Sequence, residues 1–340
     1  MATPEGYGAQ SVHYDRVLTN YSAAVFNDQS NFLAHRIFPM VSVQHLSDKF
    51  DFYPSGYFMH INDERRAEEA VANRVNYNVA RKSYICEEYA LRTFISDKKR
   101  SNVDSQRNLD MEATKLVVDS MRTAAESRFV NTFLTTGKWG ADWTGKASTA
   151  TESNKEFVKF SDAASDPIKV FKTLSNDMLL RGLRRPNVAI ITRDVWDVIT
   201  EHPDIMDRIK YGGTPNAPAM ITMQAVASLF ELDQIFVMDS IYNAAPDGVL
   251  DENGMPPQDF KFMCTGKILL LHRQMNTGML SPNAAVTFSP NWLGAGTNGA
   301  PVIRRYREGM AVRGEWIEGE WCYDQRIVCP DLGILMSDVI

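Results

Sequence analysis

The chain has 340 residues, of which 44% are hydrophobic and 23% are charged. These proportions are typical of a globular protein and exclude a chain that is disordered throughout. The length favours two or more folded lobes. The formal net charge of −6 argues against a protein that grips nucleic acid, because phosphate binding requires clustered Lys and Arg. A protein that encloses DNA without gripping it is still compatible with this charge.

Residues 1–45 are predicted to form an arm, because polar and aromatic residues mix there without a sustained period and Pro39 interrupts any late helix. The sequence allows a short helix over residues 22–34. A free arm cannot bury its own apolar side chains, so we expect neighbouring copies to cover them. They are Phe26, Phe32, Leu33, Ile37 and Phe38.

Residues 48–93 are predicted to form a long two-stranded ribbon, with aromatic residues in its first limb and alternating apolar residues in its second. Such a ribbon is marginally stable alone and must lie on another surface. Its tip carries charges of both signs and is either a solvated turn or a docking tip that sets register with a neighbour. The candidate docking residues are Asp63, Glu64, Arg65, Arg66, Glu68 and Glu69.

Residues 104–136 are predicted to form one long helix, because apolar residues recur at three- and four-residue spacing and Gly137 supplies a stop signal. At about 1.5 Å per residue this helix would be roughly 50 Å long. Residues 137–165 are rich in Ser, Thr, Gly and Ala and are predicted to form a loop.

An α/β lobe is predicted to follow, since short apolar runs alternate with helical patterns. Helices are expected at residues 167–182, 193–200 and 222–230, and strands at 187–192, 234–242, 259–264 and 267–272. Residues 302–307 and 310–326 alternate apolar and charged side chains, which predicts two closing strands. No run of about 18 apolar residues occurs, so no segment is expected to span a membrane.

Two glycine-rich stretches come close to nucleotide-binding motifs and are rejected. Residues 140–147 (GADWTGKA) have Ala where the phosphate-binding loop needs Ser or Thr for Mg²⁺, and they follow a helix and not a strand. Residues 294–299 (GAGTNG) match G-x-G-x-x-G, but Pro301 and a strand-like run follow where a helix must begin.

No other pattern makes a positive case for an enzyme, so no catalytic residue, cofactor or metal is assigned. The histidines lack metal-binding spacing, and the four cysteines are scattered and are expected to be free buried thiols. Glu315, Glu318 and Glu320 could be imagined as a metal site, but a solvated strand face is the better interpretation.

The ordered parts resemble the α+β Hong Kong 97-type fold of tailed-phage and herpesvirus capsid proteins. Residues 186–199 (PNVAIITRDVWDVI), 202–211 (HPDIMDRIKY) and 229–237 (LFELDQIFV) resemble successive units of that fold. The resemblance implies five parts. They are an N-terminal arm (1–45), an extended loop or E-loop (46–95), a peripheral domain (96–182) with a spine helix (104–136), an axial domain (183–303) and C-terminal strands returning to the peripheral domain (304–340).

By resemblance, the chain is expected to be a major capsid protein that builds pentamers and hexamers of an icosahedral shell around double-stranded phage DNA. It would be assembled in the host cytoplasm and reside in the virion. Its expected partners are itself, a portal protein, a decoration protein in some phages, and a separate scaffolding protein, because no helical scaffolding extension precedes the arm. Three alternatives stay open: an encapsulin-like compartment shell, another virion part such as a tail tube, and a two-domain enzyme with an unrecognised site.

Overall fold

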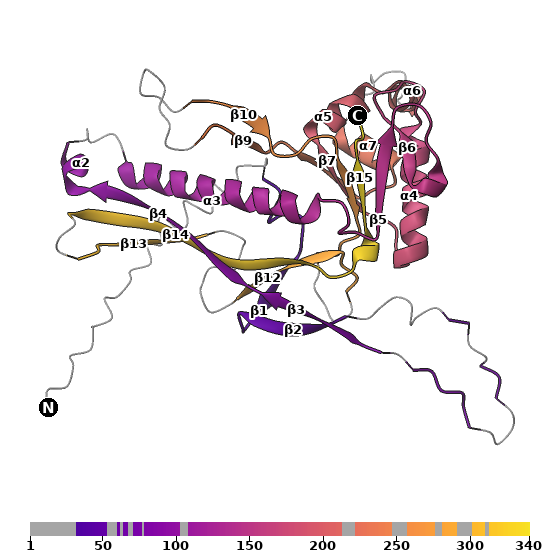
Figure 1. The fold of residues 1–340 in the computed structure, drawn as a ribbon, viewed down its shortest axis with the longest axis horizontal. Coiled ribbons are helices and arrows are strands. Elements are labelled where there is room, and N and C mark those ends of the chain that lie inside the picture. The colour runs from indigo at the N-terminus through magenta and orange to yellow at the C-terminus, as the bar shows by residue number, and fades with distance from the viewer. Residues whose placement is uncertain are drawn as a thin grey trace.

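Two β-sheets and one long helix organise the chain, as the computed structural model shows (Figure 1). The structure describes residues 32–52, 60–61, 64–66, 71–76, 78–102, 108–212, 222–246, 257–275, 281–290, 301–309 and 313–340. Helix α3 lies along the first sheet, and the second sheet with its helices stands at the carboxyl end of α3. A ribbon and a hairpin project from this frame.

The first sheet has five strands in the order β1-β12-β14-β13, with β4 on β14. Their bounds are β1 Met40–Val43, β4 Glu87–Ser96, β12 Ala285–Pro290, β13 Val302–Tyr306 and β14 Gly314–Ile327. Ile317 and Trp321 of β14 point toward α3 and are buried there. A Cβ atom on Gly319 would come within 2.7 Å of Met121 Sδ and 2.8 Å of Val117 Cγ1 on α3. The helix can therefore approach the strand closely only because residue 319 is glycine.

The predicted long helix is confirmed as α3, Leu109–Phe133, which ends before the expected residue 136. Residues 104–107 of the expected range lie outside the described residues. The start of α3 is capped by Asn108, whose side chain accepts a hydrogen bond from Met111 N at 3.2 Å. At its other end, the indole of Trp139 donates to the carbonyl of Phe133 at 2.7 Å. This bond satisfies a carbonyl at the end of the helix, which lies before the predicted stop at Gly137.

The second sheet has six strands in the order β6-β5-β15-β11-β7-β8. Their bounds are β5 Ala141–Lys146, β6 Glu156–Val158, β7 Val188–Thr192, β8 Gln234–Met238, β11 Ile268–Leu271 and β15 Gly333–Ser337. The accompanying helices are α4 Pro167–Gly182, α5 Arg193–Glu201, α6 Pro203–Gly212 and α7 Met223–Leu229. The predicted helices and the predicted strands over residues 187–192 and 267–272 are confirmed here, because their signals are local: Asp166, for example, caps α4 by accepting from Lys169 N at 2.9 Å.

The predicted division at residues 182 and 303 does not match the sheets. The expected loop over residues 137–165 contains β5 and β6, which lie in the second sheet because β5 pairs in parallel with the distant β15. The C-terminal β15 likewise joins the second sheet and not the first, while β12 lies in the first sheet. Each of these partners is far away in sequence, and the pairing therefore left no local signal.

Within the described residues, the ribbon pairs over fewer residues than the sequence predicts. Strand β2, Ser47–Phe52, pairs antiparallel with β3, Ala80–Ile85. The second predicted limb does not continue along β2, because β4 instead pairs with β14 from Glu87↔Tyr323 to Ser96↔Gly314. The base of the ribbon rests on the first sheet, where the ring of Tyr84 stacks on Phe288 at 4.5 Å.

The described end of the arm is fixed to α3 by a buried carboxylate. Glu126 accepts hydrogen bonds from Leu33 N (3.0 Å), Ala34 N (2.8 Å) and the Ser240 hydroxyl (2.9 Å). Burial raises the pKa of Glu126, and these three donors oppose that rise. Nearby, His35 stacks on Trp321 at 3.8 Å, and burial together with the positive charges of Arg128 and Arg122 lowers its pKa to about 3. His35 is therefore a neutral packing residue.

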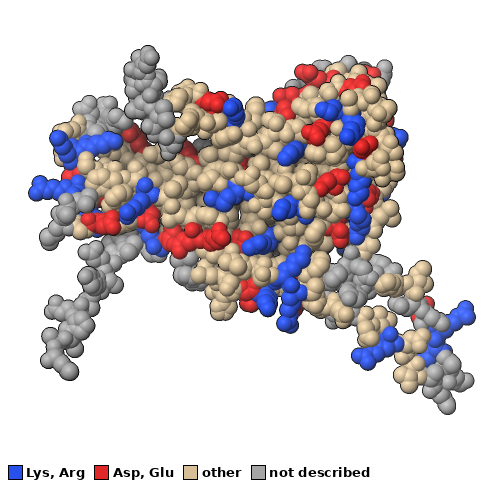
Figure 2. Space-filling view, in the orientation of Figure 1, with Lys and Arg blue, Asp and Glu red and all other residues tan. Residues whose placement is uncertain are grey.

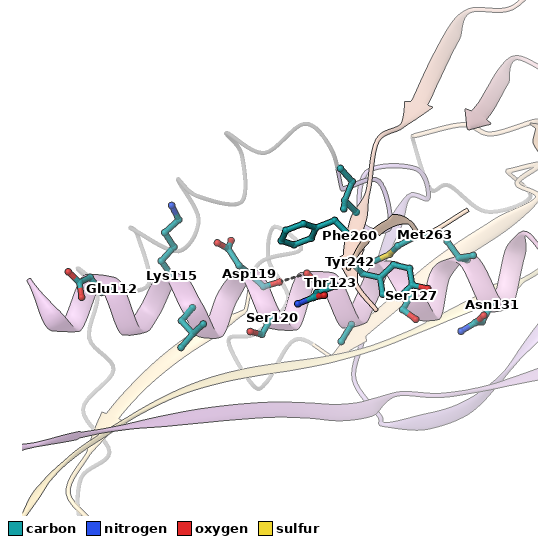
Figure 3. A pocket seen from close by; sticks show the side chains of 15 residues that line it. Glu112, Lys115, Asp119, Ser120, Thr123, Ser127, Asn131, Tyr242, Phe260 and Met263 are labelled. Atoms are coloured by element: carbon teal, nitrogen blue, oxygen red, sulfur yellow. Dashed lines mark hydrogen bonds between the residues drawn. The ribbon is translucent and has the colours of Figure 1, made fainter. Parts of the chain in front are cut away.

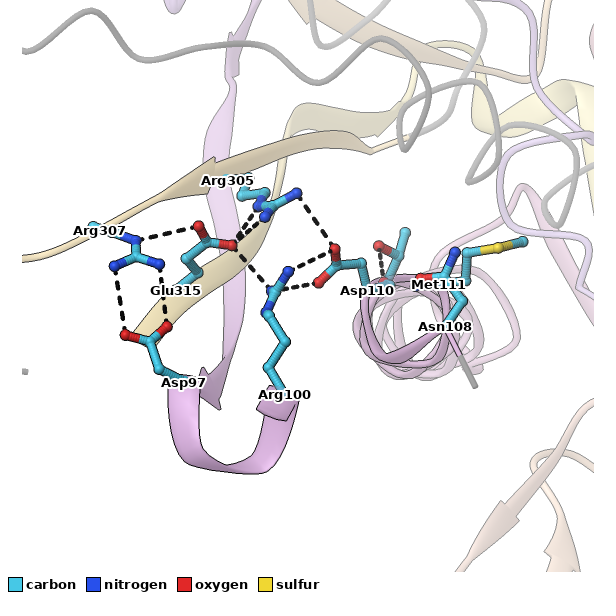
Figure 4. A network of polar contacts seen from close by, with 9 residues as sticks. Asp97, Arg100, Asn108, Asp110, Met111, Arg305, Arg307 and Glu315 are labelled. Atoms are coloured by element: carbon cyan, nitrogen blue, oxygen red, sulfur yellow. Dashed lines mark hydrogen bonds and ion pairs between the residues drawn. The ribbon is translucent and has the colours of Figure 1, made fainter. Parts of the chain in front are cut away.

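An ion-pair network joins the far end of the first sheet to α2, Asp97–Ser101, and to α3 (Figure 4). Arg100 contacts Asp110 at 2.7 Å and Glu315 at 3.0 Å. Arg305 also pairs with both carboxylates, and Arg307 bridges Glu315 at 3.2 Å and Asp97 at 3.1 Å. Burial alone would raise the pKa of Glu315, but hydrogen bonds from Arg305 and Arg307 outweigh it and lower that pKa.

We expect Glu126→Ala to lower the free energy of unfolding by about 3 kcal/mol, because it leaves buried donors without an acceptor. Urea unfolding of the unassembled subunit measures this loss. Lys115→Ala, an exposed position on the same helix, serves as the control and should change stability by less than about 0.5 kcal/mol. Equal effects of the two substitutions would contradict the anchoring role of Glu126.

The network also predicts acid sensitivity. Because the folded-state pKa of Glu315 lies below its ordinary value of 4.5, its contribution is fully present above pH 4.5 and is lost as the pH falls through the lowered value. Glu315→Gln should therefore be less stable than the unsubstituted chain at pH 7, and the difference should narrow below pH 4.5. Thermal unfolding at several pH values measures it, and a constant difference would count against the proposed linkage.

Candidate assembly surfaces

The described tip residues of the ribbon are exposed. Glu64, Arg65 and Arg66 all have exposed side chains, as docking residues require. Asp63, Glu68 and Glu69 lie outside the described residues. Assignment of the tip to an interface stays a prediction.

Apolar side chains accompany these charges along the ribbon. Ile61 is fully exposed, Val71 is 93% exposed and Val75 is 65% exposed. Each such side chain would gain about 1.5–3 kcal/mol on full burial. The described part of the subunit leaves them exposed, so this part of the chain is suited to a contact with another surface.

We expected neighbouring copies to cover the apolar residues of the arm, but the described ones are largely covered by their own subunit. Leu33, Ile37 and Phe38 are at most 3% exposed within their own subunit, because they pack against Phe129 and Phe133 of α3. Phe32 is half-buried under the guanidinium of Arg122 at 4.7 Å. Phe26 lies outside the described residues. Residues 32–38 are therefore an anchor inside the subunit, and Phe38 is not available to a neighbour.

A groove of about 1230 Å³ runs between α3 and a short hairpin (Figure 3). The hairpin consists of β9, Ile241–Asn243, and β10, Phe260–Phe262. Tyr242 and Phe260 line the groove from the hairpin side, and Ser120, Thr123 and Ser127 are among the α3 residues that line it. The sequence signal for the groove was weak, because two three-residue strands carry too little periodicity to show which face is open.

The face of the first sheet away from α3 carries an acidic stripe. Figure 2 shows acidic side chains gathered along β4 and β14. Glu320 is 4% exposed and pairs with Arg304 at 2.5 Å. Burial and a hydrogen bond shared with Glu88 raise the pKa of Glu320 to about 7, and Arg304 opposes this rise. This carboxyl therefore holds a proton more readily than an ordinary Glu.

The rejected metal site stays rejected on geometric grounds. Glu315 lies on the α3 side of β14 with Arg305, while Glu318 accepts from Tyr306 and Glu320 pairs with Arg304 on the other face. Because side chains alternate along a strand, Glu315 points away from Glu318 and Glu320. Among the described residues, no group of His, Cys, Asp or Glu could hold a metal ion.

Of the two glycine-rich stretches rejected as nucleotide-binding motifs, the one that the structure describes is part of a β-sheet. Residues 141–146 form β5 inside a sheet, and residues 294–299 lie outside the described residues. All four cysteines are free; Cys86, Cys264 and Cys322 are buried as predicted, whereas Cys329 is half-buried. Burial raises the pKa of Cys86 to about 12, so it is a poor nucleophile. The described helices lack the length and apolar character needed to cross a membrane.

Comparison with known proteins gives one curated relative in sequence. The chain is 24% identical over 238 residues to the major capsid protein of Burkholderia phage BcepMu, covering 70% of this chain and 72% of the relative. No protein-family model matches the chain.

Solved structures extend the comparison to almost the whole chain. A phage-related protein from Bordetella bronchiseptica RB50 has a TM-score of 0.64 at 17% identity and covers 97% of this chain and 98% of its own. The mature capsid of bacteriophage PhiM1 has a TM-score of 0.53 at 11% identity, covering 88% and 84%. A virus-like particle from Pyrococcus furiosus has a TM-score of 0.51 at 12% identity, covering 96% and 100%. The chain thus resembles the major capsid proteins of tailed phages and has their mixed helix-and-sheet, Hong Kong 97-type fold.

Proposed function

We propose that the chain is the major capsid protein of a tailed phage, and that its copies form the pentamers and hexamers of an icosahedral shell around double-stranded DNA. The observation that carries this proposal is the ribbon, which extends from a capsid-type fold and leaves Ile61, Val71 and Val75 exposed. The sequence relationship to a phage major capsid protein supports it. The role is structural and not catalytic.

The assembly mechanism follows from the distribution of buried and exposed surface. The ribbon of each copy lies on the next copy, where its apolar side chains are covered and its charged tip selects the register. Repeating such a head-to-tail contact around an axis closes a ring. Each contact can be weak, because a subunit that is already held by one contact meets its next partner at a high effective concentration.

Other properties of the shell follow from the same proposal. The net charge of −6 suits a wall that encloses DNA without gripping its phosphates. A separate scaffolding protein, a portal protein and, in some phages, a decoration protein complete the head. Assembly takes place in the host cytoplasm, and the product resides in the virion.

A second candidate is a compartment shell of the same fold, enclosing protein cargo instead of DNA. The likeness to the Pyrococcus furiosus virus-like particle favours keeping it, because the fold does not tell the two kinds of shell apart. The sequence relationship favours the phage capsid. Nucleic acid in native particles separates the two.

We expect the full chain, expressed with and without candidate scaffolding protein, to give closed shells in negative-stain electron microscopy. Open tubes would replace the proposal with a tail-tube subunit. A monomer or small oligomer under both conditions would refute a shell protein and favour the enzyme alternative.

The ribbon gives a sharper test. Deleting residues 62–73, or introducing Val71→Asp together with Val75→Asp, should leave a soluble subunit that forms no shells. Leu180→Asp on α4 is the matched control, since Leu180 is also 83% exposed but lies in the second lobe. Analytical ultracentrifugation and electron microscopy measure the outcome. Normal shells from the ribbon variants would show that the ribbon is not an assembly contact.

A further inference from the structure

We propose that residues 17–31 of the arm dock in the groove between α3 and the β9–β10 hairpin of their own subunit. The ligand of this groove would thus be a segment of the same chain. The inference concerns the isolated subunit and does not depend on the shell-forming function.

The groove has the walls of a binding site for an apolar segment. On the hairpin side, Phe260 is 63% exposed and Tyr242 is 39% exposed, and on the helix side Leu116 is 61% exposed. Ser120 and Thr123 of α3 also line the groove, and their small side chains leave room for a chain to approach the helix closely. Figure 3 shows Phe260 and Tyr242 above this part of α3.

The hairpin itself needs a partner. Its strands pair over only three residues each, from Phe260↔Asn243 to Phe262↔Ile241, and form a sheet of their own. All six positions are exposed. A two-stranded hairpin without a packed face is marginal in water, so a segment held between it and α3 would stabilise it.

The described chain begins at the rim of this groove. Phe32 lies under Arg122, and Leu33 N and Ala34 N are bonded to Glu126. On a helix, residues three or four apart are neighbours, so these two anchors adjoin the groove residues Asp119, Thr123 and Val130. The Ser240 hydroxyl, one residue before β9, bonds the same carboxylate at 2.9 Å. Arm, helix and hairpin therefore meet at one point.

The length of residues 17–31 is sufficient. The groove follows α3 from Glu112 to Asn131, a distance of roughly 28 Å at 1.5 Å per residue. Fifteen extended residues can span up to about 50 Å. In an extended conformation the segment is long enough to reach the far end of the groove. In a helical conformation it is long enough to fill most of the groove.

The composition of the segment matches the groove. Asp28 is the only charged residue in the segment. Large apolar side chains recur along the segment at short intervals: Val17, Leu18, Tyr21, Val25 and Phe26. Occupation by the same chain is favoured over a second copy, because the link through Phe32 holds the segment at a high effective concentration. When docked, it would pack between the β9–β10 hairpin and α3 and hold the two together.

Photo-crosslinking tests this proposal in the full-length, unassembled subunit. The photoreactive residue p-benzoylphenylalanine replaces Leu116, and in a separate control it replaces Leu180 on α4, which is 83% exposed. Trypsin cuts after Arg16 and Arg36 and isolates the segment in one peptide, residues 17–36. Mixing ¹⁴N- and ¹⁵N-labelled subunits before irradiation distinguishes crosslinks within a chain from those between chains.

We expect position 116 to crosslink to residues 17–31 within the same chain, and position 180 not to do so. Phe260→Asp should lower the yield from position 116 roughly tenfold or more, the factor that corresponds to losing a buried aromatic side chain. Leu180→Asp should leave the yield unchanged. Circular dichroism of each variant verifies that the subunit is folded.

Three results would overturn the proposal. They are the absence of crosslinks to residues 17–31, mixed-isotope crosslinks that identify a second copy as the occupant, and a yield indifferent to Phe260→Asp. Because the readout is a crosslink in single subunits, shells that form normally while the crosslink is absent would reject this inference and leave the capsid function standing.

Discussion

The carboxylate of Glu126 is the interaction on which the arrangement of the subunit depends. It is buried in α3 and accepts from the backbone of residues 33 and 34 and from Ser240. A buried charge is tolerated only where hydrogen bonds replace water, so the three donors must stay in place together. One helix residue thereby fixes both the described end of the arm and the start of the hairpin.

Around this junction, the subunit covers some apolar surface itself and leaves the rest open. The anchor of residues 32–38 is packed inside, with Leu33, Ile37 and Phe38 against the aromatic end of α3. The ribbon and the α3 groove carry the exposed apolar side chains. The buried apolar surface stabilises the fold of one subunit. The exposed apolar surface is available for contacts with other copies.

The same division applies to charge. In the network around Glu315, the carboxylates pair with guanidinium groups from strands and helices of the same subunit. The ribbon tip instead exposes Glu64, Arg65 and Arg66. Charges exposed in this way add little to the stability of the subunit.

The sequence by itself determined the long helix α3, the capped helix α4 and the buried strands β7 and β11, because periodicity and capping act over a few residues. The ordered set of parts also indicated the fold. Only the tertiary structure decided that β15 pairs with β5 and β11 and that β4 pairs with β14 instead of extending the ribbon. It also decided that Phe38 is buried within its own subunit. It alone also revealed the carboxylate junction at Glu126 and the groove under Phe260. These features depend on residues about 60 to more than 200 positions apart, and neither spacing nor composition records which distant segments meet.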